Sequence, residues 1–289
     1  MDRFNVADNK ELDKWIESKE TIDISNAIKV LKEVKQILGS FGVTFFLRQS
    51  TCLGAIRDNG FIPWDIDVDI GSVIGLHGLT EESLDQIVVA FRNNGFLTRI
   101  ERGDSIIYLP LVKLSIRCDW ICFKIIDDYI VQFPFLKTPL SLFTNLKEIA
   151  FLGEKFYVPN PPEEYLRHKY GDDWQIPKRW GEFEEDVLNQ ATKMPAHNSI
   201  GELRQLIARY LLFWRASKIR VLDKERKPVD GAEVIAVGLG HYRTDKQGYA
   251  SFYVPRDDFY PLIVRFENQK KINYLQRIKP GEVIDIRLL

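Results

Sequence analysis

Three aspartates recur at every second position, and this spacing could hold a metal ion. Asp65, Asp67 and Asp69 alternate with aliphatic residues. In a strand, side chains two residues apart share a face and lie roughly 6.6 Å apart along the chain. We therefore expect a strand over 66–70 with its carboxylates on one side. Like charges this close repel unless a cation neutralises them. Oxygen ligands without nearby His or Cys favour Mg²⁺ or Mn²⁺ over zinc, and a solvated acidic edge strand is the alternative.

A second group of residues, just before the acidic segment, is suited to phosphate. Ser50 and Thr51 open a turn of small residues that follows a buried strand. Such a strand-to-helix turn presents N–H and hydroxyl groups to phosphate oxygens. Arg57 lies close in sequence and is expected to clamp a phosphate with two hydrogen bonds. Arg48 is suited either to a phosphate contact or to a salt bridge.

One more carboxylate stands in an apolar segment. Asp119 lies within the strand expected over 112–122. A carboxylate in such a strand is unfavourable unless it is paired or bound to a metal. A sheet could bring it beside the acidic segment. The alternative is an ion pair between Asp119 and Arg117 or Lys113.

The segments expected to position these groups show apolar residues at both helical and strand spacing. We expect helices over 26–38, 51–57, 80–94 and 200–216, and further strands over 43–47, 96–101, 105–109 and 129–133. Thr80 is the expected N-cap of the third helix, and Ser199 with Glu202 forms a capping box for the fourth. This order predicts an α/β (α+β) domain with a mixed sheet over residues 1–217.

The composition indicates a folded protein and argues against several functions. Lys plus Arg is 40 and Asp plus Glu is 41, so the basic excess typical of nucleic-acid binding is missing. The apolar stretches are far shorter than the ~20 residues of a membrane-spanning helix, and the N-terminus lacks a signal-peptide pattern. Three cysteines without a CxxC pair indicate reduced thiols. We expect a cytoplasmic protein, with peripheral contact to the inner membrane face left open.

From residue 218 onward the pattern contains only strands and turns. It predicts a small antiparallel β-sandwich over 218–289. The pieces Gly231 to Val234 and Thr244 to Gly248 resemble those of the carboxypeptidase regulatory-like, transthyretin-like domains. The aspartates of this region are expected in turns, and binding of an acceptor glycan or a partner is a hypothesis for it.

Segment 45–71 resembles the LicD family, the group that includes fukutin and fukutin-related protein. The matching residues are Thr51, Leu53, Gly54, Ala55, Arg57, Phe61, Ile62, Pro63, Trp64, Asp65, Asp67 and Asp69. A second match includes Val158, Pro159, Pro162, Tyr165, Leu166, Tyr170, Gly171, Asp172, Asp173, Trp174 and Pro177. Together they cover about residues 25–180. Ser50 stands where the family usually has glycine, and Ile66 replaces its middle aspartate.

The resemblance implies a nucleotidyltransferase-like fold whose metal ligands are two aspartates on one strand and a third on its neighbour. Here these are Asp67, Asp69 and Asp119, with Mg²⁺ or Mn²⁺ as the cofactor. Asp119 would orient or deprotonate the acceptor or serve only as a ligand, and Asp65 would support the ligands. Ser50, Thr51, Arg57 and Arg48 would hold phosphates.

The family activity is transfer of a phospho-alcohol, such as phosphocholine or ribitol phosphate, from a CDP-activated donor to a glycan hydroxyl. The resemblance therefore implies modification of a cell-surface glycan of the lipopolysaccharide or teichoic acid type. Transfer of a nucleoside monophosphate to a small molecule is an alternative, and a catalytically silent glycan-binding protein is another. His168 and Lys169 are expected on the surface of a helix, with a position facing the pocket as the alternative. Trp64 and Trp174 either stack on a base, line the pocket or pack in the core.

Overall fold

The computed structural model describes residues 6–132, 136–178 and 216–288. The chain divides into two compact units, one of Met1–Val131 with Lys137–Phe183 and one of Gln132–Leu136 with Glu184–Leu289. The helix expected over 200–216, with its capping box at Ser199 and Glu202, falls almost wholly outside the described residues. The predicted domain boundary at 217/218 therefore stays a prediction.

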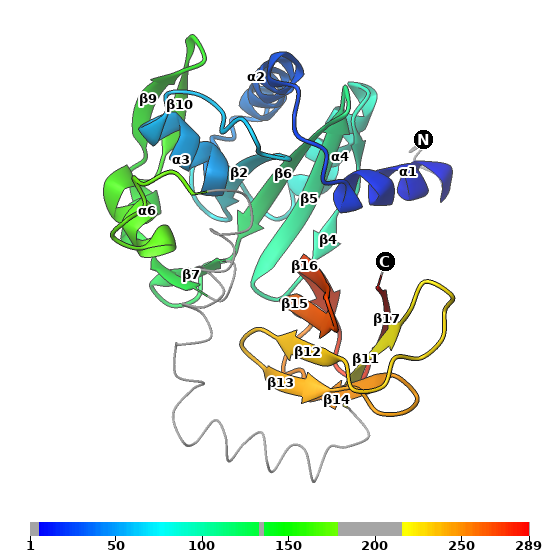
Figure 1. The fold of residues 1–289 in the computed structure, drawn as a ribbon. Helices are drawn as coiled ribbons and strands as arrows, with labels where there is room; N and C mark the ends of the chain where they lie inside the picture. Colours follow the sequence, from blue (N-terminus) through cyan, green and yellow to red (C-terminus); the bar gives the residue numbers. More distant parts are fainter. Residues whose placement is uncertain (1–5, 133–135, 179–215, 289) are drawn as a thin grey trace. The chain divides into compact units, whose positions relative to one another are not determined.

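A mixed sheet forms the centre of the first unit, in the order β1-β2-β6-β5-β3, with β4 also paired to β5 (Figure 1). Its strands are β1 (Phe46–Leu47), β2 (Val68–Val73), β3 (Leu97–Thr98), β4 (Glu101–Arg102), β5 (Ile106–Lys113) and β6 (Ile116–Phe123). β2 and β6 run parallel, and the other pairs are antiparallel. Every residue of β2 and β6 is buried. The expected mixed α/β architecture is confirmed.

The first unit also contains helices, of which the first four contact strands of this sheet. The helices are α1 (Val6–Glu17), α2 (Ile24–Ser40), α3 (Gln49–Arg57), α4 (Leu84–Asn93), α5 (Ser141–Thr144) and α6 (Pro162–Tyr170). The expected helix over 26–38 lies within α2, which buries a face with Leu31, Val34 and Ile37. The carboxylate of Asp23 caps this helix by accepting from the Asn26 N–H at 2.8 Å. α2 contacts β6 and α4, and α3 contacts β2. No helix of the described residues is both long and apolar enough to cross a membrane.

Several predicted bounds are wrong. The acidic strand begins at Val68, so Asp65 and Asp67 precede it and only Asp69 lies within it. The backbone before the strand bonds locally instead, because the Asp65 N–H donates to the Ile62 carbonyl at 3.0 Å. The strand expected over 112–122 is broken by a turn between β5 and β6. Thr80 is not the N-cap of α4, which begins after Ser83.

Two short strand pairs complete the description of the chain up to residue 178. They are β7 (Tyr129–Gln132) with β8 (Leu136–Pro139), and β9 (Lys147–Phe151) with β10 (Glu154–Val158). Aromatic rings fix the β9–β10 pair, since Phe156 lies 6.2 Å from Phe45 and Phe151 lies 5.6 Å from Phe61 between centroids. The three cysteines are buried and unpaired, as expected for reduced thiols.

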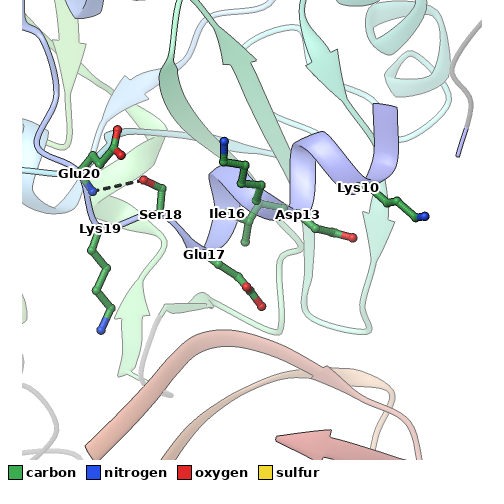
Figure 2. Close-up of a pocket in the computed structure, with 8 residues that line it drawn as sticks. Lys10, Asp13, Ile16, Glu17, Ser18, Lys19 and Glu20 are labelled. Atoms are coloured by element: carbon green, nitrogen blue, oxygen red, sulfur yellow. Dashed lines mark hydrogen bonds between the residues drawn. The ribbon is translucent and has the colours of Figure 1, made fainter. Parts of the chain in front are cut away.

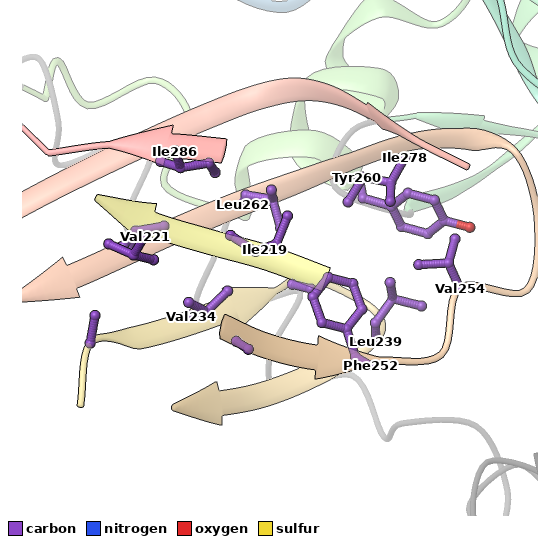
Figure 3. Close-up of a cluster of buried hydrophobic side chains, with 14 of the residues drawn as sticks. Ile219, Val221, Val234, Leu239, Phe252, Val254, Tyr260, Leu262, Ile278 and Ile286 are labelled. Carbon is purple, nitrogen blue, oxygen red and sulfur yellow. The ribbon is translucent and has the colours of Figure 1, made fainter. Parts of the chain in front are cut away.

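The second unit contains two sheets that share a hydrophobic core. Their orders are β14-β11-β17 and β13-β12-β15-β16. The strands are β11 (Ser217–Leu222), β12 (Glu233–Ala236), β13 (Gly240–Arg243), β14 (Tyr249–Phe252), β15 (Asp258–Phe266), β16 (Gln269–Ile278) and β17 (Val283–Arg287). Figure 3 shows the buried cluster, to which both sheets contribute side chains such as Val221 and Leu262.

One expectation for this unit is wrong and another is confirmed. β11 pairs with β17 in parallel, so the first of the two sheets is mixed and not antiparallel throughout. Asp245 is a turn residue, because its Oδ1 accepts from the N–H groups of Gln247 and Tyr249. The resemblance to regulatory-like domains stays a prediction.

We predict that Gly54→Ala lowers the unfolding free energy by about 1–3 kcal/mol, because the added Cβ would overpack a closed site. That Cβ would lie 2.4 Å from the Gly60 carbonyl oxygen, a backbone atom that cannot swing away. Gly39→Ala is the matched control, since Gly39 lies in α2 and a Cβ added there would meet nothing within 4 Å. It should be neutral or stabilise the helix. Urea unfolding measures both, and equal effects would contradict the packing argument.

Candidate active site

Two buried carboxylates lie side by side on neighbouring parallel strands. Asp69 on β2 is the register partner of Asp119 on β6, which is the juxtaposition considered from the sequence. The two residues are only 7% and 6% exposed. The backbone of Asp69 is held from the other side, where its N–H donates to Thr51 Oγ1 at 2.8 Å and its carbonyl accepts from the Arg48 N–H at 3.1 Å. The junction of β1 and α3 thus fixes one member of the pair.

Arg48 and Ser50 contact the carboxylate of Asp69 directly. Arg48 Nη2 lies 2.7 Å from Asp69 Oδ1, and Ser50 Oγ donates to Oδ2 at 3.1 Å. Arg48 Nε also donates to the Ile70 carbonyl at 3.1 Å. Of the two roles expected for Arg48, the structure shows the salt bridge. Thr51 is fully buried and uses its hydroxyl inside the protein, so its predicted phosphate contact has no support here.

A glycine on β2 makes room for this arginine. A Cβ on Gly71 would lie 3.2 Å from Arg48 Cδ and 2.7 Å from the ring of Phe46. Both neighbours are buried and cannot move aside easily. The absence of a side chain at this position therefore permits the path of Arg48 toward Asp69.

Arg117 joins the remaining carboxylates to the end of α1. Its Nη2 bonds to the Asp67 carboxylate, and its Nε lies 3.5 Å from Asp119 Oδ1. Its Nη1 donates to the carbonyls of Ile16 at 2.5 Å and Trp15 at 3.4 Å. Sequence reasoning raised Arg117 only as an alternative partner of Asp119. The signal for its wider role was its position, two residues before Asp119 and on the same face of the strand.

Tyr108 on β5 supports Asp119 from the other neighbouring strand. Its hydroxyl donates to Asp119 Oδ1 at 2.9 Å. Burial raises the pKa of Tyr108 well above its usual value, and the charge of Asp119 adds to the shift. Tyr108 therefore stays a hydrogen-bond donor at neutral pH. Sequence reasoning missed it, because a tyrosine in an apolar strand usually indicates core packing.

The carboxylates destabilise one another in this buried cluster. Burial raises the pKa of Asp69 to about 7, with Asp67 and Asp119 adding to the shift and Arg48 opposing it. Burial also raises the pKa of Asp119, against the effect of Arg117. The pKa of Asp65 is raised well above its usual value by burial and by Asp67. An added cation would favour the ionised form of all of these groups.

The residues present suit a hard divalent cation. Within the described part of the chain, no group of three or more His, Cys, Asp or Glu side chains is already arranged as a set of ligands. Arginines engage Asp67 and Asp69 instead. However, Asp65 Oδ2 is buried and has no hydrogen-bond partner among the described residues. An orphaned carboxylate oxygen in an all-oxygen cluster of raised pKa fits Mg²⁺ or Mn²⁺.

The helix α6 adds a buried lysine to the site, and the expected surface position of Lys169 is wrong. Lys169 is 2% exposed, because it lies on the same helix face as Tyr165 and Leu166. Burial and the nearby Arg48 lower its pKa to about 7, while Asp69 opposes the shift. Tyr165 ties this helix to α3 by accepting from the Gln49 N–H at 3.1 Å.

The other residues considered from the sequence lie apart from the carboxylates or in the core. Arg57 pairs with Asp58 through two hydrogen bonds of 2.9 and 2.7 Å. It lies at the opposite end of α3 from Ser50, roughly 10 Å along the helix axis. His168 bonds to the Lys137 carbonyl at 3.0 Å. Trp174 is buried at 5% exposure, as core packing predicts, whereas Trp64 is 38% exposed.

An open hollow of about 780 Å³ runs along α1 and the residues after it (Figure 2). Its lining residues are Lys10, Asp13, Lys14, Ile16, Glu17, Ser18, Lys19 and Glu20. Charges of both signs alternate in it, and none of the clustered carboxylates lines it. The hollow is therefore distinct from the candidate active site.

Comparison with known proteins supports the family resemblance of the first unit. Residues 42–102 match the family model "LicD/FKTN/FKRP, nucleotidyltransferase domain". This segment contains Ser50, Asp65, Asp67 and Asp69, whereas Asp119 lies beyond it. The match falls within the stretch 25–180 over which the sequence motifs resemble this family.

The chain is similar to ribitol-5-phosphate transferase FKTN of Mus musculus, at 28% identity over 178 residues, covering 55% of this chain and 36% of the relative. The Homo sapiens protein of that name is 27% identical over 169 residues, covering 54% and 34%. An uncharacterized protein, RP689 of Rickettsia prowazekii, is 26% identical over 129 residues, covering 45% and 43%. The chain thus spans about a third of the length of the ribitol-5-phosphate transferases it matches.

Among solved structures, a type II cohesin–X-dockerin complex of Acetivibrio cellulolyticus matches with a TM-score of 0.20 and 13% identity. The match covers 25% of this chain and 51% of that chain. A likeness at this level carries no argument about fold. The nucleotidyltransferase-like fold stays a prediction.

The raised pKa of Asp69 predicts how stability depends on pH in the metal-free protein. The folded protein keeps a proton that the unfolded chain releases near pH ~4, so folding weakens as pH rises toward 7. Between pH ~5 and ~7, the unfolding free energy of the wild type should fall by about 2 kcal/mol, and Asp69→Asn should abolish this fall. Lys169, whose pKa is lowered to about 7, begins to lose its proton only at the upper end of this window, where its effect is smaller and of opposite sign. Urea unfolding in EDTA measures the effect, and parallel pH profiles for the two proteins would contradict it.

Proposed function

We propose that this protein is a divalent-metal-dependent transferase that moves a phospho-alcohol from a CDP-activated donor to a hydroxyl of a cell-surface glycan. The observation that carries the proposal is the pairing of Asp69 with Asp119 on adjacent parallel strands, with Asp67 joined to the same cluster through Arg117. The match to the LicD nucleotidyltransferase domain and the similarity to ribitol-5-phosphate transferases support it. Phosphocholine and alditol phosphates are the donor groups to screen first.

The acidic cluster would hold the cation through Asp67, Asp69 and Asp119. A divalent cation there would neutralise charge that develops on the donor diphosphate. Asp65 lies close to these ligands, since burial and then the charges of Asp67 and Asp69 raise its pKa. Because Asp69 and Asp119 are nearly closed to solvent, the charges act on the substrate with little screening by water.

The donor phosphates would lie at the start of α3. The N-terminus of this helix carries N–H groups without helical partners, which favour an anion. Ser50 supplies a hydroxyl there, and Arg48 and Lys169 supply positive charge close to Asp69. The residues of this end of α3 would thus hold the leaving CMP group while the carboxylates face the transferred phosphate.

Asp119 is the residue we propose to receive the acceptor proton. Its Oδ1 takes the contacts from Tyr108 and Arg117 that the structure describes. Its Oδ2 is therefore the atom assigned to the acceptor hydroxyl or to the cation. Burial raises the pKa of Asp119, which brings its basicity closer to what a general base needs at neutral pH.

The first measurement is calorimetric titration of CDP and CTP, with and without Mg²⁺, on wild type and Asp69→Asn. We expect CDP to bind only with Mg²⁺ and to lose binding in the variant, because Asp69 is a proposed ligand. A preference for CTP would favour transfer of a nucleoside monophosphate instead. Absence of binding by either nucleotide would favour a silent glycan-binding protein.

We further predict that Asp67→Asn, Asp69→Asn and Asp119→Asn each lower turnover by roughly 10³-fold or more, since each removes a proposed ligand charge. Release of CMP from CDP-alditols or CDP-choline measures turnover, and circular dichroism confirms the fold. Asp85→Asn is the matched control, because Asp85 is an exposed aspartate paired with Arg102 and should be fully active. Retained activity in both Asp67→Asn and Asp69→Asn would refute the proposal.

A further inference from the structure

Arg117 connects two features that the proposed mechanism leaves separate, the carboxylate cluster and α1. Its guanidinium contacts two carboxylates, Asp67 and Asp119, and two main-chain carbonyls, Trp15 and Ile16. Its side chain is only 9% exposed. Planar guanidinium has five N–H donors in fixed directions, so one arginine can serve both sets of acceptors.

The two carbonyls attract a cation independently of the carboxylates. They belong to the last turn of α1, where helix carbonyls lack helical partners and the helix dipole is negative. Arg117 therefore has an anchor that remains if its carboxylate partners are taken by another cation. Arg48, in contrast, has its second contact on β2 itself, at the Ile70 carbonyl.

We propose that Arg117 occupies the cation's place between Asp67 and Asp119 in the metal-free protein, releases both carboxylates when metal binds, and stays bound to the end of α1. This inference rests on the proposed function and deepens it. Arg117 is a positioning residue: it neutralises the cluster before the metal arrives and competes with the metal for the same oxygens. α1 thereby becomes part of the metal site without contributing a ligand.

Competition between Arg117 and a metal ion predicts that loss of Arg117 lowers the stability of the metal-free protein and raises its affinity for the metal. Removing a guanidinium from two buried carboxylates destabilises the metal-free protein, because their charges are then uncompensated. The same removal leaves the carboxylates more available to a metal ion. An arginine that only supported the ligands would give the opposite result, since its loss would weaken metal binding.

Calorimetric titration of MnCl₂ into EDTA-stripped full chain tests this. Arg117→Met should bind Mn²⁺ about tenfold tighter than wild type, and Arg117→Lys about threefold tighter, because an ammonium cannot bridge both carboxylates and the helix end. Arg99→Met is the matched control. Arg99 also ties α1 to the sheet, through Asp13 and Glu101, but contacts none of the clustered carboxylates. Its Mn²⁺ affinity should equal that of wild type.

Equal or weaker Mn²⁺ binding by Arg117→Met would overturn the competition and leave the proposed function standing. If this variant does not fold in EDTA, the Mn²⁺ affinity of Arg117→Lys relative to wild type provides the same test. If neither wild type nor any variant binds Mn²⁺, the inference and the metal dependence of the proposed function both fall.

Hydrogen exchange tests the anchor. With Mn²⁺ bound, the amides of α1 in wild type should keep or gain protection, because Arg117 stays on the Trp15 and Ile16 carbonyls. Loss of protection over α1 on metal binding would overturn this part of the inference. Arg99→Met is again the control, because it weakens the attachment of α1 to the sheet without changing the contacts of the carboxylates.

Discussion

A pair of carboxylates on neighbouring parallel strands determines the charge balance of the first unit. Asp69 and Asp119 are register partners, and each would be strongly unfavourable in an ordinary sheet interior. Hydrogen bonds from Ser50 and Tyr108 and the two nearby arginines offset this cost only in part, because the pKa values of both aspartates remain raised. The unit is thus folded around a cluster whose charge is incompletely neutralised.

The secondary structure distributes the compensating groups over separate elements. Arg48 comes from the residue before α3, Arg117 from β6, and Lys169 from α6. No one of these elements can shift without changing the electrostatics of the cluster. Opposite faces of β6 also differ in role, since Arg117 and Asp119 share one face while Trp120 packs against Phe91 of α4 on the other, at 6.1 Å between ring centroids. Core packing and charge placement therefore depend on the same strand.

The sequence was a good guide where one chemical property decided the outcome. The helical periodicity over 26–38 predicted α2, and Asp119 in an apolar strand correctly indicated a carboxylate beside Asp69. The sequence was a poor guide where a local backbone hydrogen bond formed a turn in place of the strand that alternating residues predicted. Asp65 and Asp67 alternate as in a strand, yet the turn at Ile62 uses the backbone of Asp65.

Charged residues were the second source of error. Lys169 looked like a surface residue because lysine usually is one, although it stands four residues after Tyr165 on the buried face of α6. Arg117 looked like a simple partner of Asp119, and its contact with α1 depends on a helix about 100 residues earlier in the chain. Such contacts follow from tertiary packing, which neither periodicity nor a local motif reports.

Gly71 links the backbone of β2 to this charge pattern. Its missing side chain leaves the space through which Arg48 reaches Asp69. Residues 48 and 71 therefore depend on each other, and Arg48 also contacts the neighbouring Ile70 carbonyl, 22 residues away in the chain. Across related sequences, glycine at this position should therefore covary with arginine before α3. A chain that replaced the arginine by a smaller residue would no longer need the glycine, and the strand could then gain a β-branched residue of higher strand propensity.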